Sequence, residues 1–230
     1  MLITWRITCA KADMSKLRTV LFDLDGTLID TAPDMANALN LLLAEEGKPT
    51  LAYEIIRPIV SNGSVALVQL GFGESTAQLD RLKQRYLDIY LAHLCEQSTL
   101  FDGMQELLTH IEQSNMNWGV VTNKPGWLTN PLMQQIGLAD RAATIISGDT
   151  TKNRKPHPEP MLLASKQAGS EPAQCIYIGD AQRDIEAGNN AGMKTVIALY
   201  GYIAASENID DWQAHHRIQH PREIMEFINN

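Results

Sequence analysis

Five short runs of apolar and β-branched residues are spread along this chain of 230 residues. The runs are almost continuously apolar rather than alternating, which is typical of strands buried on both faces of a parallel sheet. Amphipathic stretches of helical length lie between the later runs, at 126–137, 157–168 and 182–191. This alternation predicts an α/β fold with a doubly wound parallel sheet. The predicted strands are TVLFDLD (19–25), WGVVTN (118–123), ATIISG (143–148), CIYIGD (175–180) and KTVIAL (194–199).

The segment from residue 32 to residue 100 contains no convincing strand and is rich in Leu, Ala, Gln and Glu. Its patterns MANALNLLLAEE (35–46) and ESTAQLDRLKQRYLDIYLAHL (74–94) have helical periodicity. A helical block of this size is too long for a simple crossover between two strands, so we interpret residues 32–100 as an inserted all-helical cap domain. The α/β core then consists of residues 19–31 and 101–230.

Residues 1–18 precede the first predicted strand as an N-terminal extension. The sequence MLITWRITCAKAD (1–13) lacks the sustained apolar stretch of a signal peptide, and Met14 begins a natural opening for the first strand. We therefore expect residues 1–13 to come from an upstream start choice and to be disordered. The sequence leaves open whether translation starts at Met1 or at Met14.

The overall charge and the cysteines limit the partners and the location of the protein. A formal net charge of −8 repels a nucleic-acid backbone, so we expect no nucleic-acid partner. No run approaches the roughly 18 apolar residues of a membrane span, so we expect no membrane partner. Cys9, Cys95 and Cys175 form no metal-binding pattern, and we expect free thiols in a reducing cytoplasm. The oligomeric state stays open between a monomer and a homodimer.

Three of the predicted strands end in polar residues that can bind a ligand. Asp23 and Asp25 close the first strand, Thr122 and Asn123 close the second, and Asp180 closes the fourth. Ligands of an open parallel sheet bind outside the carboxyl ends of the strands. We therefore expect these five side chains to converge on one crevice.

Four motifs, together and in this order, resemble those of the haloacid dehalogenase (HAD) superfamily of aspartate-nucleophile phosphotransferases. They are DLDGT (23–27), VVTN (120–123), KP (155–156) and GDAQRD (179–184). The resemblance covers essentially the whole chain after Met14. It implies a small-molecule phosphate ester as the substrate.

The resemblance assigns Asp23 as the nucleophile that forms an aspartyl-phosphate, a recognised role for a carboxylate. It assigns Asp25 as the general acid and base, and a spacing of two residues places both side chains on one side of a strand. Dehalogenases of this superfamily lack an acid at the position of Asp25, because a halide leaving group needs no proton. We therefore expect hydrolysis of a phosphomonoester, with a β-phosphoglucomutase-like phosphotransferase as the alternative. A non-catalytic binding module would predict the loss of a key residue, and none is lost.

Thr122, Asn123 and Lys155 are the residues expected to bind the transferring phosphoryl group. The Thr122 hydroxyl and the amide or backbone N–H of Asn123 suit equatorial phosphoryl oxygens. Lys155 supplies a positive charge. Lys152 competes for this role, but the superfamily motif places its lysine directly before a proline, as in KPHPEP (155–160).

The resemblance also implies a Mg²⁺ site at the same edge of the sheet. Its ligands would be the Asp23 carboxylate, the Asp25 backbone carbonyl and Asp180, with Asp184 acting directly or through water. Mg²⁺ prefers oxygen ligands of this kind. The ion and Lys155 would reverse the local negative charge, so that an acidic protein can bind an anion.

The inserted cap resembles that of phosphoglycolate phosphatases, which implies a small phosphorylated acid or sugar acid as substrate. Four segments are most similar to bacterial N-acetylmuramic acid 6-phosphate phosphatases: FDGM (101–104), WGVVTNKP (118–125), LMQQIGL (132–138) and YGYI (200–203).

Within the cap, we expect Arg57 and the loop residues Ser61, Asn62 and Gly63 to contact the part of the substrate beyond the phosphate. Arg57 suits a carboxylate, because a guanidinium binds it with two parallel hydrogen bonds. A surface arginine before Pro58 explains the same sequence equally well.

Overall fold

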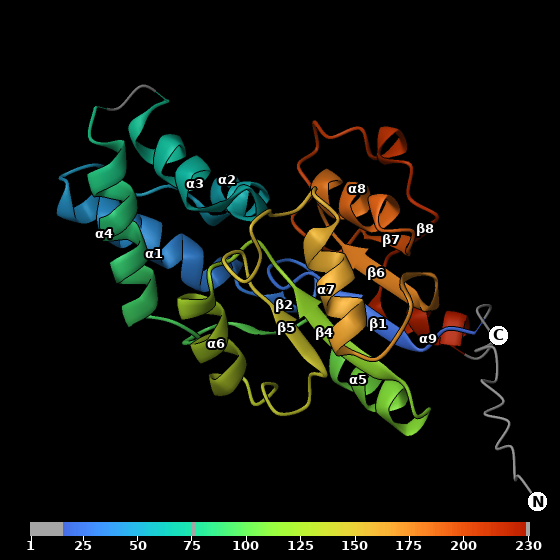
Figure 1. Cartoon of the computed structure of the whole chain (residues 1–230). Coiled ribbons are helices and arrows are strands. Elements are labelled where there is room, and N and C mark those ends of the chain that lie inside the picture. Colours follow the sequence, from blue (N-terminus) through green and yellow to red (C-terminus); the bar gives the residue numbers. More distant parts are fainter. Residues whose placement is uncertain (1–15, 75–76, 229–230) are drawn as a thin grey trace, which may run out of the picture.

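The computed structural model describes residues 16–74 and 77–228 of the chain. Residues 1–13, for which the sequence predicts disorder, lie outside this range, as does Cys9. Figure 1 shows a central sheet with helices on both of its faces and a group of helices, α1 to α4, to one side.

The central sheet has six strands in the order β5-β4-β1-β6-β7-β8, and every neighbouring pair is parallel. The five predicted strands are confirmed, each within three residues of its expected ends. The sixth, β8, was not predicted, because two of its three residues are exposed and it lies at the edge of the sheet. The strands are β1 (Thr19–Phe22), β4 (Asn117–Val121), β5 (Thr144–Ile146), β6 (Cys175–Gly179), β7 (Lys194–Ala198) and β8 (His216–Ile218).

The sheet is doubly wound around β1, as the sequence predicts. From β1 the order runs through β4 to β5 on one side and through β6 and β7 to β8 on the other. Successive residues of a strand point to opposite faces. Accordingly Val20 and Phe22 join one hydrophobic cluster and Leu21 joins another, and all three are fully buried. This burial on both faces explains why the strands read as continuous apolar runs.

Among the described residues, five α-helices surround the sheet, and the clusters of Leu21 and Phe22 show which face some of them cover. Met161 of α7 and Ala187 of α8 pack in the cluster of Leu21, and the buried residues of α5 pack in the cluster of Phe22. The predicted helices α6, α7 and α8 are confirmed, while α5 and α9 were not predicted. The helices are α5 (Met104–Gln113), α6 (Gly126–Gln135), α7 (Glu159–Gln167), α8 (Gln182–Asn190) and α9 (Ile224–Ile228).

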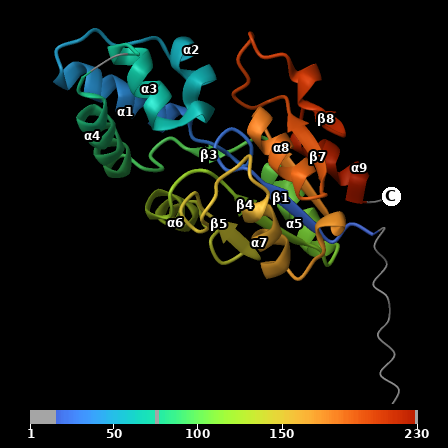
Figure 2. The same ribbon diagram turned by 45° about the horizontal axis from the view of Figure 1, so that its top comes forward.

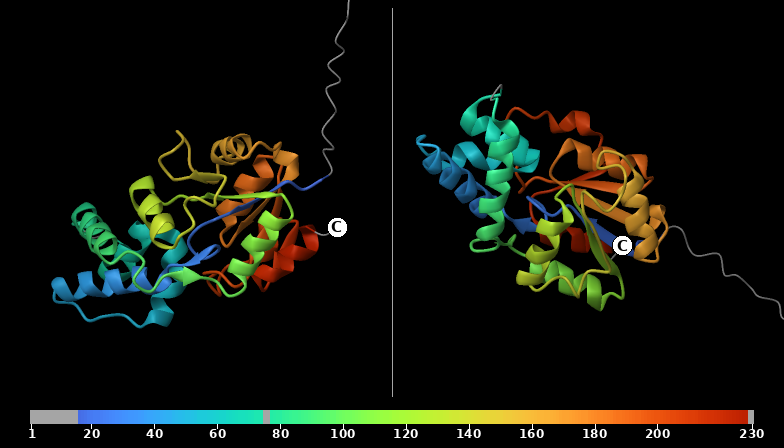
Figure 3. Two further views of the ribbon diagram at one scale, coloured as in Figure 1. Left: turned by 90° about the horizontal axis from the view of Figure 1, so that it is seen from below. Right: turned by 60° about the vertical axis from the view of Figure 1, so that its left-hand side comes forward.

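We call residues 32–100 the cap region. Where the structure describes it, this region consists mainly of helices, from Ala32 to Phe72 and from Leu79 to Ala92, with their connecting loops. Figures 1, 2 and 3 show these helices gathered beside the carboxyl ends of the strands. The chain leaves and re-enters the core through an antiparallel pair of two-residue strands, β2 (Ile29–Asp30) and β3 (Thr99–Leu100). The cap elements are α1 (Ala32–Glu45), α2 (Tyr53–Ile56), the 3₁₀ helix η1 (Arg57–Asn62), α3 (Gly63–Phe72) and α4 (Leu79–Ala92).

One stretch of the cap region, Tyr53–Phe72, is long and apolar enough to cross a membrane by length and composition alone. The structure divides this stretch into α2, η1 and α3, with Gly63 at a φ of +82° where α3 begins. A membrane span needs its backbone hydrogen bonds satisfied along its whole length. The stretch is therefore weak evidence for a membrane helix.

Candidate active site

The carboxyl ends of β4, β1 and β6 lie side by side and bring together the residues that follow these strands. Asp23, Thr122 and Asp180 are the first residues after the three strands, and each is at most 4% exposed. Two backbone hydrogen bonds extend the ladder past the strand ends, from Asp23 N to the Ile178 carbonyl (2.8 Å) and from Thr122 N to the Ile146 carbonyl (2.9 Å). The sheet itself therefore fixes the backbone from which these side chains project.

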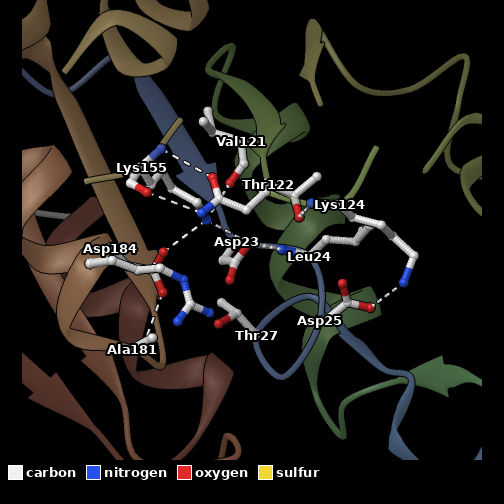
Figure 4. A network of polar contacts seen from close by, with 12 residues as sticks. Asp23, Leu24, Asp25, Thr27, Val121, Thr122, Lys124, Lys155, Ala181 and Asp184 are labelled. Atoms are coloured by element: carbon white, nitrogen blue, oxygen red, sulfur yellow. Dashed lines mark hydrogen bonds and ion pairs between the residues drawn. The ribbon is translucent and has the colours of Figure 1, made fainter. Parts of the chain in front are cut away.

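Lys155 lies at the centre of this group (Figure 4). Its Nζ is 2.8 Å from Oδ1 of Asp23 and 2.8 Å from Oδ1 of Asp184, and it also donates to the Val121 carbonyl and the Tyr177 hydroxyl at 2.9 Å. Burial alone would lower the pKa of Lys155, but Asp184 and Asp23 outweigh it and the pKa lies above its ordinary value. The ammonium is therefore a permanent buried charge. Lys152, the competing lysine, is exposed.

Asp23, Asp180 and Asp184 form an acidic cluster whose carboxylate oxygens lie within 4.8 Å of one another. The pKa of Asp23 is raised to about 6, mainly by burial. The positive charge of Lys155 lowers this pKa, and the negative charge of Asp184 raises it further. Burial, Asp23 and Asp184 together raise the pKa of Asp180 to about 7. Lys155 and the nearby Arg183 are thus not enough to balance the carboxylates. Three buried oxygen ligands suit a divalent hard cation. The residues present fit Mg²⁺.

The turn after β1 brings the backbone close to Asp180. Gly26 has a φ of +84°, and a Cβ at this position would collide with Oδ2 of Asp180. The same oxygen accepts hydrogen bonds from the backbone N–H of Tyr202 (2.8 Å) and from the Ser61 hydroxyl (2.8 Å). Glycine is therefore required here by both the backbone conformation and the space.

A cavity of about 570 Å³ opens over this group, between the core and the cap region. Asp23, Asp25 and Thr122 line it from the core side. The cap region contributes Met35 of α1, the turn around Ser61, and residues of α3 and α4. The cavity also contains four basic side chains: Lys83, Lys124, Arg154 and Arg183.

Comparisons with known proteins agree with this geometry. Residues 20–198 match the family model described as haloacid dehalogenase-like hydrolase. The chain belongs to the haloacid dehalogenase-like hydrolases. It is 43% identical over 217 residues to the N-acetylmuramic acid 6-phosphate phosphatase of Pseudomonas putida, covering 94% of this chain and 97% of that one. It is 42% identical over 210 residues to the phosphoglycolate phosphatase of Xanthomonas campestris, covering 91% and 95%.

A solved structure supports the same assignment. A predicted phosphoglycolate phosphatase from Haemophilus somnus superposes with a TM-score of 0.81 at 26% identity, covering 92% of this chain and 97% of that chain. The resemblance to the HAD family in the four motifs is thereby confirmed, and so is the predicted fold class.

Asp25 is not placed by strand geometry, although the spacing of two residues had predicted that it shares one side of a strand with Asp23. β1 ends at Phe22, so both aspartates lie in the turn that follows, where strand alternation does not apply. The Asp25 carboxylate accepts from the Thr31 hydroxyl (2.6 Å) and pairs with Lys124 Nζ (2.9 Å). Figure 4 shows it turned toward Lys124 and away from the acidic cluster. Both aspartates nevertheless line the same cavity.

Lys124 is a residue of this HAD-family site that the sequence reasoning missed. Its side chain is 5% exposed, and its Nζ lies 2.9 Å from both Asp25 Oδ1 and the Tyr90 hydroxyl of α4. The lysine follows directly on VVTN, so its position beside the phosphoryl-binding motif was the available signal. Its partner in the cap region could not be deduced from that position.

The Asn123 side chain is turned toward the loop that carries Lys155. Its Oδ1 accepts from the backbone N–H of Lys155 and its Nδ2 donates to the Lys155 carbonyl, both at 3.1 Å. The amide thus holds the loop that presents Lys155, and only the backbone N–H of Asn123 is left for the predicted phosphoryl contact. Thr122 Oγ1 accepts from the Lys124 N–H (3.1 Å).

Arg57 is placed differently from the other predicted cap residues. Its guanidinium donates to the carbonyls of Gly201 (3.1 Å) and Tyr200 (3.2 Å) and lies over the ring of Tyr202. It is not among the residues that line the larger cavity. In this conformation Arg57 connects the cap region to the core, and the expected contact with a substrate carboxylate lacks support. Ser61, Asn62 and Gly63 do line the cavity.

Proposed function

We propose that this protein is a Mg²⁺-dependent phosphomonoesterase that acts through an aspartyl-phosphate on a small phosphorylated acid or sugar acid. The observation that carries the proposal is the buried Asp23, held at 2.8 Å by Lys155 beside Asp180 and Asp184, at the base of a cavity. The names of the two relatives support the reaction class, since both are phosphatases.

Asp23 is arranged to act as a nucleophile through one oxygen. Lys155 Nζ and the Leu24 N–H both bind Oδ1, each at 2.8 Å, which orients Oδ2 as the attacking atom. A pKa of about 6 leaves the carboxylate ionised at neutral pH but more basic than an exposed aspartate. In the first step the bond from Oδ2 to phosphorus forms, and the bond from phosphorus to the ester oxygen breaks.

Asp25 is the second carboxyl group in the cavity and would move the protons. It donates a proton to the leaving alkoxide in the first step. In the second step it accepts a proton from the water that attacks phosphorus, which releases phosphate and restores Asp23. Thr122 and Lys155 would bind the phosphoryl oxygens. Asp23, Asp180 and Asp184 would hold Mg²⁺, which supplies further positive charge to the transferring group.

The cavity supports a substrate with a negative charge beyond its phosphate. Its lining contains Lys83, Lys124, Arg154 and Arg183 in a protein whose formal net charge is −8. Its volume of about 570 Å³ lies inside the range of ~300–1,000 Å³ common for ligand sites, so a sugar phosphate has room. We propose that residues 32–100 act as a cap that closes over this substrate and excludes water.

A cytoplasmic location and a monomeric or homodimeric state belong to the same proposal. Cys95 and Cys175 are free thiols in the structure, which suits a reducing compartment.

The experiment that tests the function is phosphate release with Mg²⁺ across a substrate panel. The panel holds 2-phosphoglycolate, N-acetylmuramic acid 6-phosphate, hexose phosphates and p-nitrophenyl phosphate, compared by kcat/KM. We expect one phosphorylated acid to be preferred by more than about a hundredfold, which corresponds to ~2.7 kcal/mol of differential transition-state binding. Asp23→Asn should abolish turnover while the protein stays folded.

Two outcomes would contradict this assignment. Conversion of a sugar phosphate to its isomer, without phosphate release, would favour a β-phosphoglucomutase-like transferase. Mg²⁺ binding without turnover of any ester would favour a binding module.

A further inference from the structure

The Ser61 hydroxyl reaches from the cap region into the acidic cluster. Ser61 Oγ donates to Oδ2 of Asp180 at 2.8 Å, although the two residues are 119 positions apart in the sequence. The backbone N–H of Tyr202 donates to the same oxygen at 2.8 Å. Asp180 is only 2% exposed, so these two donors fix the plane of a buried carboxylate.

Oδ1 of Asp180 faces different partners. The Thr27 hydroxyl donates to it across 3.4 Å, which is long for a hydroxyl donor. Because both short hydrogen bonds go to Oδ2, Oδ1 is the oxygen that a cation between Asp23, Asp180 and Asp184 would bind. Ser61 thus holds Oδ2, and it would set the direction of the oxygen that is left to bind an ion.

The position of Ser61 depends on how the cap region docks on the core. The Arg183 guanidinium, next to Asp184 in the sequence, donates to the Ser61 carbonyl. Arg57, at the start of η1, donates to the carbonyls of Tyr200 and Gly201. The two Arg57 bonds connect η1 to the loop of residues 200–201. The residue after this loop, Tyr202, is the other donor to Asp180. If the cap region moved away, Asp180 would lose its bond to Ser61 but would keep its bond to Tyr202.

Ser61 also lines two neighbouring cavities of the protein. Together with Asn62 and Arg183 it lines the larger cavity, which contains Asp23, and a smaller one of about 330 Å³, which contains Asp180. The hydroxyl that contacts Asp180 therefore lies at the boundary between the substrate cavity and the second opening beside the acidic cluster.

We propose that Ser61 is a positioning residue for the Mg²⁺ site, which orients Asp180 from the cap region so that cap closure and Mg²⁺ binding strengthen each other. This inference rests on the proposed function, because it takes the acidic cluster as the metal site. Groups that hydrogen-bond to metal ligands fix their orientation and affect metal affinity. Coupling between two binding events is reciprocal, so a hydroxyl that improves Mg²⁺ binding when the cap is docked also makes Mg²⁺ favour the docked cap.

The test measures Mg²⁺ affinity by calorimetry on protein freed of metal with a chelator. Ser61→Ala is expected to weaken Mg²⁺ binding about 10-fold, the lower end of what such partners contribute. Ser61→Thr and Ser61→Val form a pair of nearly equal shape in which only Thr keeps the hydroxyl. The Mg²⁺ affinity of Ser61→Thr should lie within about 2-fold of the wild-type value. The affinity of Ser61→Val should be as low as that of Ser61→Ala.

The matched control is Ser64→Ala, since Ser64 lines the same cavity but shows no hydrogen bond to the acidic cluster within the described residues. Its Mg²⁺ affinity should stay at the wild-type value. A second measurement is hydrogen exchange of the backbone in residues 57–62. Mg²⁺ should slow this exchange in the wild type and have much less effect in Ser61→Val.

The outcomes separate this inference from the function on which it rests. Equal Mg²⁺ affinity in the wild type, Ser61→Ala and Ser61→Val would overturn the role of Ser61 and leave the metal site intact. A wild-type protein that binds no Mg²⁺ would overturn both the metal site and the role of Ser61. Thermal melting of each variant establishes that it is folded, and the Thr and Val pair keeps the comparison valid if Ala alone perturbs the turn.

Discussion

Lys124 Nζ lies 2.9 Å from Oδ1 of Asp25, and the same nitrogen lies 2.9 Å from the hydroxyl of Tyr90 in α4. The two charged side chains are 5% and 15% exposed, so the pair is largely shielded from water. The proposed acid–base residue is thus oriented by a cation of the core that is itself held by the cap region. A group that moves protons must be held within hydrogen-bond reach of the reacting oxygen.

Replacement of Lys124 by Met should therefore lower activity through Asp25. We expect kcat/KM for the preferred ester to fall by roughly 10- to 100-fold, a part of the 10²- to 10⁴-fold that acid–base catalysis typically contributes. Lys83→Met is the control, since Lys83 lines the same cavity without an ion pair among the described residues. If the two variants lose activity equally, Lys124 contributes only general positive charge.

We expect Lys155 to stabilise the fold in addition to its proposed role in binding the phosphoryl group. Its Nζ lies 2.8 Å from both Asp23 and Asp184 at 1% side-chain exposure, so Lys155→Met leaves two buried carboxylates without their cation. Removal of one partner from a buried ion pair costs about 3–5 kcal/mol. For a chain of this size that lowers the melting temperature by roughly 10 °C.

Calorimetric melting with and without Mg²⁺ checks the prediction for Lys155→Met. The ion should recover part of the loss, because it supplies positive charge to the same carboxylates. Lys152→Met is the matched control, since Lys152 is exposed and should melt like the wild type. A Lys155→Met protein as stable as the wild type would show that the carboxylates are neutral in the metal-free state.

The sequence was sufficient to predict five of the six strands of the sheet and the convergence of its polar strand ends. Asp23, Thr122 and Asp180 each follow an apolar run, and parallel strand geometry alone brings such positions together. Lys155, which precedes a proline, was predicted from the family motif and not from hydrophobic periodicity. Short edge strand β8 was missed because the sequence HRI has no apolar pattern to mark it.

What the sequence could not show is how loops dock on one another. The Asn123 amide turns to the backbone of Lys155, Arg57 binds the carbonyls of Tyr200 and Gly201, and Lys124 meets Tyr90. Each of these contacts depends on where the cap region or a loop packs in three dimensions. Residue types at a motif indicate chemistry, but they leave several partners equally possible until the fold is known.

Gly26 is predicted to be essential for the metal site because it touches Asp180. A Cβ in Gly26→Ala would collide with Oδ2 of Asp180, whereas in Gly47→Ala it would meet nothing within 4 Å. Both glycines have positive φ, +84° and +67°, so the control carries a similar backbone strain. Gly26→Ala should weaken Mg²⁺ binding by at least about 10-fold, as expected when a ligand is displaced. Calorimetry with Mg²⁺ measures this, and equal affinities in the two variants would contradict it.

The acidic cluster should make the metal-free protein less stable as the pH rises. Folding raises the pKa of Asp23 to about 6 and that of Asp180 to about 7, from near 4 in an unfolded chain. Between about pH 4 and pH 7 the folded state therefore binds more protons than the unfolded state, and the free energy of unfolding falls with pH. We expect the melting temperature in the presence of a chelator to drop by a few degrees from pH 5.5 to pH 7.5.

Saturating Mg²⁺ should remove most of that drop, because the ion takes the place of the protons between the carboxylates. Asp180→Asn should flatten the profile in chelator as well, since its amide does not ionise. Melting curves at five or six pH values, each with and without Mg²⁺, measure both effects. A wild-type melting temperature that rises across this range in chelator would mean that the cluster is already ionised when it is buried, and that Lys155 and Arg183 balance its charge without the ion.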